Sequence, residues 1–86
     1  MRIKYSKNAL KFLAKMEAKQ VQRIRAAVSG LTKSPPEGDM KPLGGYSDGR
    51  MRLRVGGWRV IFRFGQENEI EILLVLDIGN RGDIYK

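Results

Sequence analysis

The chain has 86 residues and carries 17 lysines and arginines against 9 acidic residues, an excess that points to an anionic partner such as nucleic acid, an acidic protein segment or a membrane surface. This length predicts a single domain over residues 1–86, and the absence of cysteine excludes disulfides and thiolate metal sites. The absence of histidine removes the commonest general base, and no apolar run approaches the roughly 20 residues of a membrane span.

Residues 1–33 predict one short strand followed by helices. Residues 1–5 alternate apolar and basic side chains, and Ser6 offers a hydroxyl that can cap the next helix. Two apolar stripes at helical spacing follow, with a change of register near Glu17, so we expect a helical hairpin, although one bent helix over 7–32 also fits. The two stripes are Ala9, Leu10, Leu13 and Met16, then Val21, Ile24, Val28 and Leu31.

The same 33 residues hold nine basic side chains against the single Glu17. A lysine stripe on a helix usually forms only a solvated face. It also suits a second nucleic-acid contact surface, because phosphate contacts need little beyond charge and reach. The basic residues expected on the two helices are Lys7, Lys11, Lys15, Lys19, Arg23 and Arg25.

Residues 34–49 are expected to connect the helices to the next strand as a loop. Pro35 and Pro36 end the helical region because proline cannot continue a helix. The following stretch, 40–49, is polar and rich in glycine. Lys41 and Tyr46 lie on this connection, where either could contact a ligand.

Residues 50–64 predict a β-hairpin with two chemically opposite faces. Arginines alternate with apolar residues in the first arm, which is the pattern of a half-buried strand. Gly56-Gly57 then supplies a two-residue turn, since glycine adopts positive φ at no steric cost. The turn fixes the register and gives one apolar face, formed by the pairs Val55–Trp58, Leu53–Val60 and Met51–Phe62.

The other face of this hairpin is predicted to be basic. The register sets two opposed pairs, Arg54 with Arg59 and Arg50 with Arg63, on the same side as Arg52. Directly opposed like charges are unfavourable by some tenths of a kcal/mol. A chain that tolerates this repulsion is expected to place an anion there, although strand arginines also serve as a solvated face that discourages aggregation.

The most apolar stretch, residues 70–78, is typical of a central strand covered on both faces. These elements together predict an α+β fold, with a short N-terminal strand and a helical hairpin packed on a twisted, mainly antiparallel sheet of about four strands. The tail 79–86 leaves the central strand and need not reach far to lie near the basic face.

The basic face and the tail together suit cleavage of an RNA backbone. Attack by the 2′-hydroxyl passes through an extra-charged, pentacovalent phosphorus, and preorganised donors aimed at such charge are usually the largest catalytic term. With histidine absent, the best candidate base is Tyr85, whose pKa nearby cations would lower, although Tyr85 also fits a packing role at the sheet edge. The guanidinium groups suited to the phosphorus are those of Arg52, Arg54, Arg59 and Arg81.

The segments RLRVGGWRVIF at 52–62 and IGNRGDIY at 78–85 resemble the toxins of the RelE/ParE superfamily of bacterial toxin–antitoxin modules, and the likeness covers the whole chain. The resemblance implies a microbial RNase-like fold and a cytoplasmic toxin, neutralised by an antitoxin whose C-terminal segment wraps it and covers the basic face. In the RelE branch it implies cleavage of mRNA in the ribosomal A site, with mRNA and the ribosome as partners and no metal or other cofactor. It carries the roles near the scissile bond onto Arg52, Arg54, Arg59, Arg81 and Tyr85, and we expect further phosphate contacts at Arg50, Arg63, Lys41 and Lys86.

The chain departs from the superfamily pattern at two places. Asn80 stands where many relatives have histidine, and arginine stands at 52 and 54 where some have lysine. Two other functions also fit the sequence, a ParE-like toxin that inhibits DNA gyrase without cutting RNA and an inactive RNA- or antitoxin-binding module. The ending with Arg81 and Tyr85 favours a ribosome-dependent mRNA endoribonuclease of a bacterium or archaeon.

Overall fold

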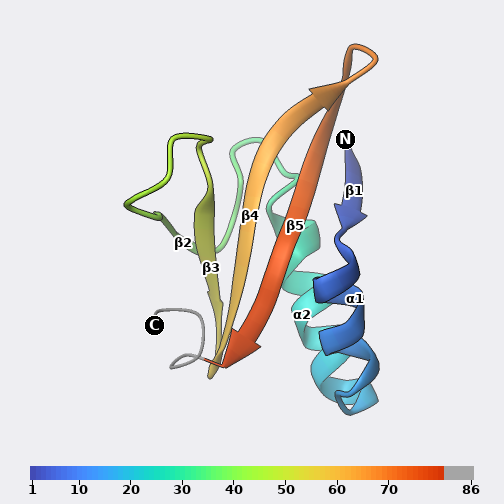
Figure 1. The fold of residues 1–86 in the computed structure, drawn as a ribbon. Coiled ribbons are helices and arrows are strands. Elements are labelled where there is room, and N and C mark those ends of the chain that lie inside the picture. The colour runs from blue at the N-terminus through green and yellow to red at the C-terminus, as the bar shows by residue number, and fades with distance from the viewer. Residues whose placement is uncertain (81–86) are drawn as a thin grey trace.

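The computed structural model describes residues 1–80, which form one five-stranded mixed sheet with two helices on one of its faces (Figure 1). The strand order is β1-β5-β4-β3-β2, so the last strand of the chain lies inside the sheet. The predicted α+β fold is confirmed. The elements are β1 (Arg2–Tyr5), α1 (Lys7–Ala14), α2 (Ala18–Gly30), β2 (Asp39–Pro42), β3 (Met51–Val55), β4 (Trp58–Glu67) and β5 (Ile70–Asn80).

The helical region is a pair of helices and not one bent helix. Ser6 caps α1, because its Oγ accepts a hydrogen bond from the Ala9 backbone N–H at 3.1 Å and donates one to the Leu76 carbonyl at 2.7 Å. α1 ends at Ala14, and α2 begins at Ala18 with Glu17 as its N-cap residue. Leu10, expected in the apolar stripe, is 47% exposed, since α1 packs against β5 through a narrower stripe that buries Ala9 and Leu13.

β5 is an interior strand of the sheet, as its apolar sequence predicted, although β4 and not β5 lies at the centre of the strand order. Within residues 1–80 the expected cover on both faces is not found, because the helices lie on one face and Asp77 on the other is exposed. β5 pairs in parallel with β1 and in antiparallel fashion with β4, so both of its edges are hydrogen-bonded. The β4–β5 ladder shifts register between Ile61 and Phe62, which leaves one extra residue, Leu76, on the β5 side. The parallel β1 strand makes the sheet mixed.

A fifth strand, β2, lies where the sequence predicted only a loop. Asp39 to Pro42 pair with β3, Asp39 opposite Arg54 and Lys41 opposite Arg52. No local pattern marks this segment as a strand; its backbone is held by the neighbouring strand. Pro42 is tolerated because β2 is the edge of the sheet, where a missing N–H costs no internal hydrogen bond.

The hairpin of β3 and β4 has the predicted register. Val55 pairs with Trp58, and Arg54 pairs with Arg59. Gly56 has φ 60° and is the only positive φ in the two-residue turn, as in a type II′ hairpin turn. The β3–β4 pairing described within residues 1–80 begins at Met51, opposite Phe62. The predicted pair of Arg50 with Arg63 is not part of it.

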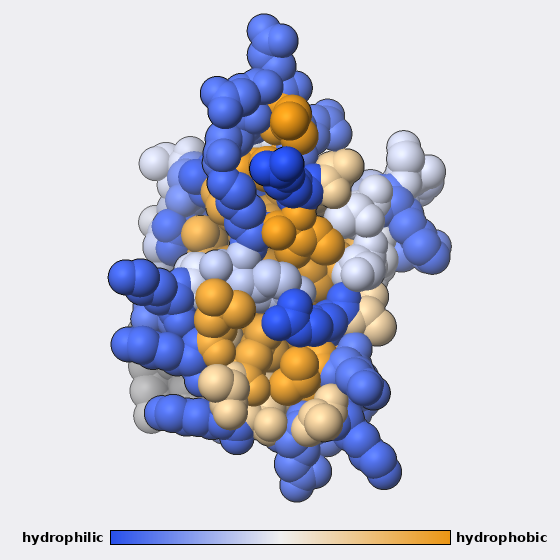
Figure 2. All heavy atoms as spheres, turned by 90° about the vertical axis from the view of Figure 1, so that its right-hand side faces the viewer, coloured by the Kyte–Doolittle hydropathy of each residue, from blue (hydrophilic) through white to orange (hydrophobic). Residues whose placement is uncertain are grey.

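The core lies between the sheet and the two helices. The apolar face of the hairpin packs against residues of α1, α2 and β5. Neither helix of residues 1–80 is long and apolar enough to cross a membrane. Seen from the helical side, a hydrophobic strip runs down the molecule between hydrophilic side chains (Figure 2). The largest fully buried side chains are Phe62, Ile24, Leu31, Leu53, Leu73, Val28, Val60 and Val75.

Candidate functional site

One face of the sheet carries no helix (Figure 1). On this face the strand register aligns two rows of residues across β2, β3, β4 and β5. Because successive residues of a strand point to opposite faces, the neighbours of the buried Leu53 and Val60 point away from the core. We call this the outer face. Its first row is Lys41, Arg52, Ile61 and Asp77, and its second row is Asp39, Arg54, Arg59 and Gly79.

Arg52 lies at the centre of the outer face and is only 9% exposed. Its Nη1 lies 3.4 Å from the Asp39 carbonyl oxygen and 3.8 Å from the Asp39 Oδ1. These contacts orient the guanidinium toward β2 and neutralise part of its charge. Arg52 is therefore mainly a buried part of the outer face and exposes little of its side chain to solvent.

Arg54 and Arg59 lie side by side in the second row, opposite one another across β3 and β4. Both side chains are half-buried, so their positions are more restricted than those of surface arginines. Arg54 forms no ion pair with an acidic residue among residues 1–80. Each guanidinium group offers a planar, multiply donating fork that matches the oxygens of a phosphate.

Arg50 belongs to a separate cluster in the loop before β3. Its Nη2 donates to the Asp48 Oδ2 at 2.9 Å, and its guanidinium stacks 4.1 Å from the centre of the Tyr46 ring. The hydrogen bond from Arg50 lowers the pKa of Asp48, with a smaller contribution from the charge of Arg63. The pairing with Asp48 holds Arg50 in the loop before β3, so the phosphate contacts expected at Arg50 and Arg63 stay predictions.

The predicted tail residues Arg81, Tyr85 and Lys86 lie outside the described residues. β5 ends at Asn80, and its neighbour Gly79 pairs with Arg59, so the described chain ends beside the second row of the outer face. Sequence reasoning missed Asp39 and Asp77 in these rows, because no local signal shows which residues of the neighbouring strands lie opposite them. Residues 1–80 contain no cluster of three acidic, histidine or cysteine side chains that could hold a metal ion.

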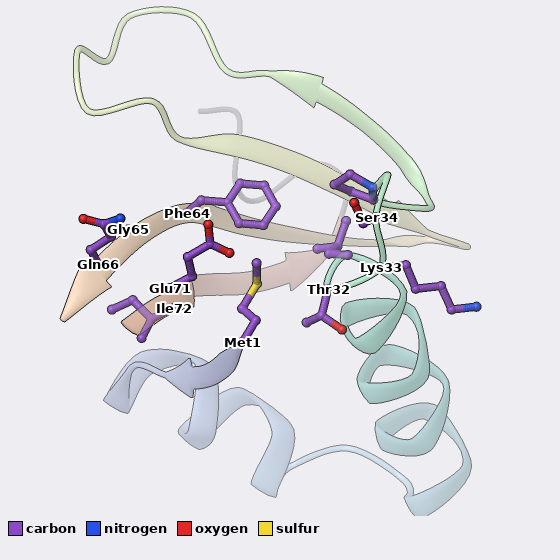
Figure 3. Close-up of a pocket in the computed structure, with 11 residues that line it drawn as sticks. Met1, Thr32, Lys33, Ser34, Phe64, Gly65, Gln66, Glu71 and Ile72 are labelled. Carbon is purple, nitrogen blue, oxygen red and sulfur yellow. The ribbon is translucent and has the colours of Figure 1, made fainter. Parts of the chain in front are cut away.

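A hollow of about 720 Å³ opens on the other face of the sheet, between the β4–β5 hairpin, the N-terminus and the end of α2 (Figure 3). Its apolar lining includes Met1, Phe64 and Ile72, and its charged lining residues are Lys33 and Glu71. Lys33 also pairs with Glu37. This hollow lacks the clustered cations of the outer face and is not a phosphate site.

Comparison with known proteins identifies relatives of the whole chain. A family model described as the ParE toxin of the type II toxin–antitoxin system, parDE, matches residues 3–85. No curated protein sequence matches significantly.

Solved structures similar to this chain are also toxins. A chain of the archaeal RelE–RelB complex from Pyrococcus horikoshii OT3 is 26% identical over 95% of this chain and 96% of that one, with a TM-score of 0.72. The YoeB/ParE toxin from Agrobacterium tumefaciens is 18% identical over 94% and 99%, with a TM-score of 0.76. The isolated E. coli RelE toxin is 22% identical over 98% and 89%, with a TM-score of 0.67.

Proposed function

The chain belongs to the ParE toxin family of type II toxin–antitoxin systems, and from this premise we propose that it is a ribosome-dependent endoribonuclease that cuts messenger RNA. The observation that carries the proposal is the outer face, where Arg54 and Arg59 lie opposite one another at the end of β5. A scissile phosphate bound there would lie beside the point where the C-terminal residues begin.

The proposed reaction is transfer of the phosphate from the 5′-oxygen to the neighbouring 2′-oxygen. The 2′-oxygen attacks phosphorus, the bond to the 5′-oxygen breaks, and the products are a 2′,3′-cyclic phosphate and a 5′-hydroxyl. Tyr85 in its phenolate form would take the proton from the 2′-hydroxyl, Arg81 would stabilise the charge that develops on the leaving 5′-oxygen, and that oxygen would then take a proton from water. Arg54 and Arg59 would donate to the equatorial oxygens, whose charge grows in the transition state.

Arg52 has a different part in this proposal. Its contacts with Asp39 orient its guanidinium toward β2, so its positive charge would raise the potential of the outer face without contacting the phosphate directly. Lys41 is exposed beside it and would contact a flanking phosphate.

The decisive experiment maps 5′ ends on translated mRNA after expression of the wild type, Arg81→Ala and Tyr85→Phe. The wild type should produce new ends with 5′-hydroxyl groups, and both variants should reduce them strongly. Intact mRNA in growth-arrested cells would refute the nuclease, and arrest by both variants equal to that of the wild type would refute this assignment of the site.

A second candidate function is inhibition of DNA gyrase, favoured by the ParE description of the matching family model. Purified protein added to a gyrase supercoiling assay separates the two functions. Inhibited supercoiling together with intact mRNA would establish gyrase as the target and exclude the nuclease.

The proposed protein partner is a cognate antitoxin that covers the outer face. Complexes of RelE with RelB among the similar structures support this partner. The proposed location is the cytoplasm, where mRNA and ribosomes are found.

A further inference from the structure

We propose that the outward surface of α1 and α2 is a second RNA-binding surface, which holds the protein on ribosomal RNA while the outer face acts on the message. This inference rests on the proposed function. We call this surface the helical basic surface and define it by Lys7, Lys11, Lys15, Lys19 and Arg23.

The distribution of charge along the chain is the first argument. Residues 1–33 hold nine of the 17 basic residues and one of the 9 acidic residues, which leaves eight of each in residues 34–86. The formal net charge of +8 therefore comes entirely from β1, α1, α2 and their connections. A surface with this excess attracts polyanions over a distance set by the ionic strength.

The second argument is that these charges have no acidic partners. All five side chains are exposed, and none of them takes part in an ion pair among residues 1–80. Arg25 differs, because its guanidinium stacks 4.8 Å from the centre of the Tyr5 ring. The four lysines and the one arginine of the helical basic surface are thus available to an external anion.

The third argument is that Lys7 and Lys19 weaken the helices that carry them, whereas Lys11 and Lys15 lie at the C-terminal end of α1, where the helix dipole favours positive charge. Lys7, Lys11 and Lys15 follow one another at four-residue spacing, where each like-charge pair costs about 0.2–0.5 kcal/mol. Lys7 and Lys19 also lie in the first turns of α1 and α2, which contain no acidic residue, although the helix dipole favours negative charge there. Bound phosphates would reverse both effects.

The surface extends along α1 and toward the β3–β4 hairpin. Lys7 and Lys15 are eight residues apart, about 12 Å along a helix that rises about 1.5 Å per residue. Arg23 extends the surface toward the β3–β4 hairpin, since a Cβ added to Gly56 would lie 3.1 Å from its Nη2. Arg54 is two residues before Gly56, so the helical basic surface approaches the outer face at this turn.

Lysine side chains favour RNA over a protein as the occupant. They place compact charges on flexible stems, and backbone phosphates need only such charges, whereas a folded protein partner needs buried apolar anchors and matched hydrogen bonds. An acidic protein segment is the competing occupant, and the experiment below separates the two.

The experiment compares binding of the full-length protein to purified bacterial ribosomes as a function of salt. The test variant replaces Lys7, Lys11, Lys15 and Lys19 by glutamine, and the matched control replaces the same four by arginine. The glutamine variant should bind ribosomes at least tenfold more weakly near 0.15 M salt, and the slope of log Kd against log salt should fall by about three, at roughly 0.7–0.9 per lost phosphate contact. The arginine control should keep both values. Circular dichroism checks that both variants fold.

Two outcomes would overturn the inference. Unchanged ribosome binding by the glutamine variant would show that the surface does not contact RNA. Unchanged ribosome binding with lost affinity for the protein encoded by the adjacent reading frame would identify a protein-docking surface. Wild type that binds ribosomes with this salt dependence but leaves mRNA intact would instead refute the proposed cleavage and leave the second RNA surface standing.

Discussion

The outer face and the helical basic surface are both cationic, but they hold their charges differently. The outer face carries arginines on a hydrogen-bonded sheet, with Asp39 and Asp77 in the same rows. The helical basic surface carries mostly lysines, exposed and without acidic partners among residues 1–80. Nearby carboxylates hold guanidinium groups in position, whereas cations without acidic partners produce a stronger positive electrostatic potential at a distance. The first arrangement suits selection of one phosphate and the second suits capture of a long polyanion.

The largest expected difference between the two surfaces is in the rate of RNA cleavage. Arg54→Ala and Arg59→Ala should each lower the single-turnover rate by about 100- to 1,000-fold, as expected for loss of one donor to a developing charge. Arg→Lys at the same positions should recover only part of the rate, because lysine restores the charge without the fork. Rates of both alanine variants within threefold of the wild type would place the chemistry elsewhere.

Stability should separate Arg52 from Arg54. Arg52→Ala removes a buried side chain and its contacts with Asp39, so the free energy of unfolding in urea should fall by about 1–2 kcal/mol. Arg54→Ala should change it by less than about 0.5 kcal/mol, since relief of repulsion with Arg59 offsets lost packing. Equal losses would mean that both arginines are structural.

The helical basic surface should respond in the opposite direction. Lys7→Gln removes the like-charge pair with Lys11 and a positive charge from the first turn of α1, so it should raise the free energy of unfolding by about 0.5 kcal/mol at low ionic strength. The gain should disappear near 1 M salt, where screening acts within about 3 Å. Asn8→Gln, an uncharged change on the same helix, is the control that should show no salt dependence.

The smallest expected effect is a pH dependence in the loop before β3. The hydrogen bond from Arg50 lowers the pKa of Asp48 below its ordinary 3.8, so the pair stabilises the folded state fully above that value and progressively less as the pH falls through the folded pKa. Below pH 4 the melting temperature should therefore fall less steeply with decreasing pH for Asp48→Asn than for the wild type. Parallel curves would show that the pair contributes nothing measurable.

Sequence reasoning recovered the elements whose signals are local. The alternation of arginines and the Gly56-Gly57 turn predicted the register that places Arg54 opposite Arg59. It missed β2, because a short polar edge strand containing Pro42 becomes a strand only through the partner that it pairs with. Without β2 the burial of Arg52 could not be predicted either, because its partner Asp39 lies on that strand.

The candidate site was predictable in part for the same reason. Hairpin periodicity is enough to place Arg52, Arg54 and Arg59 on one face. The position of Asp77 in the first row depends on the register shift between β4 and β5, which no residue pattern announces. The roles assigned to Arg81 and Tyr85 stay predictions, because those residues lie beyond Asn80.

The position of β5 inside the sheet has a consequence for the timing of synthesis. β5 is the last element described, yet residues 72–75 pair with residues 2–5 at the start of the chain. At about 5–20 residues per second a ribosome needs about 4–17 s to make 86 residues, and during nearly all of that time β1 has no partner strand. The sheet closes only after β5 has been made, so the described fold cannot form until residues 72–75 have been synthesised and can pair with residues 2–5.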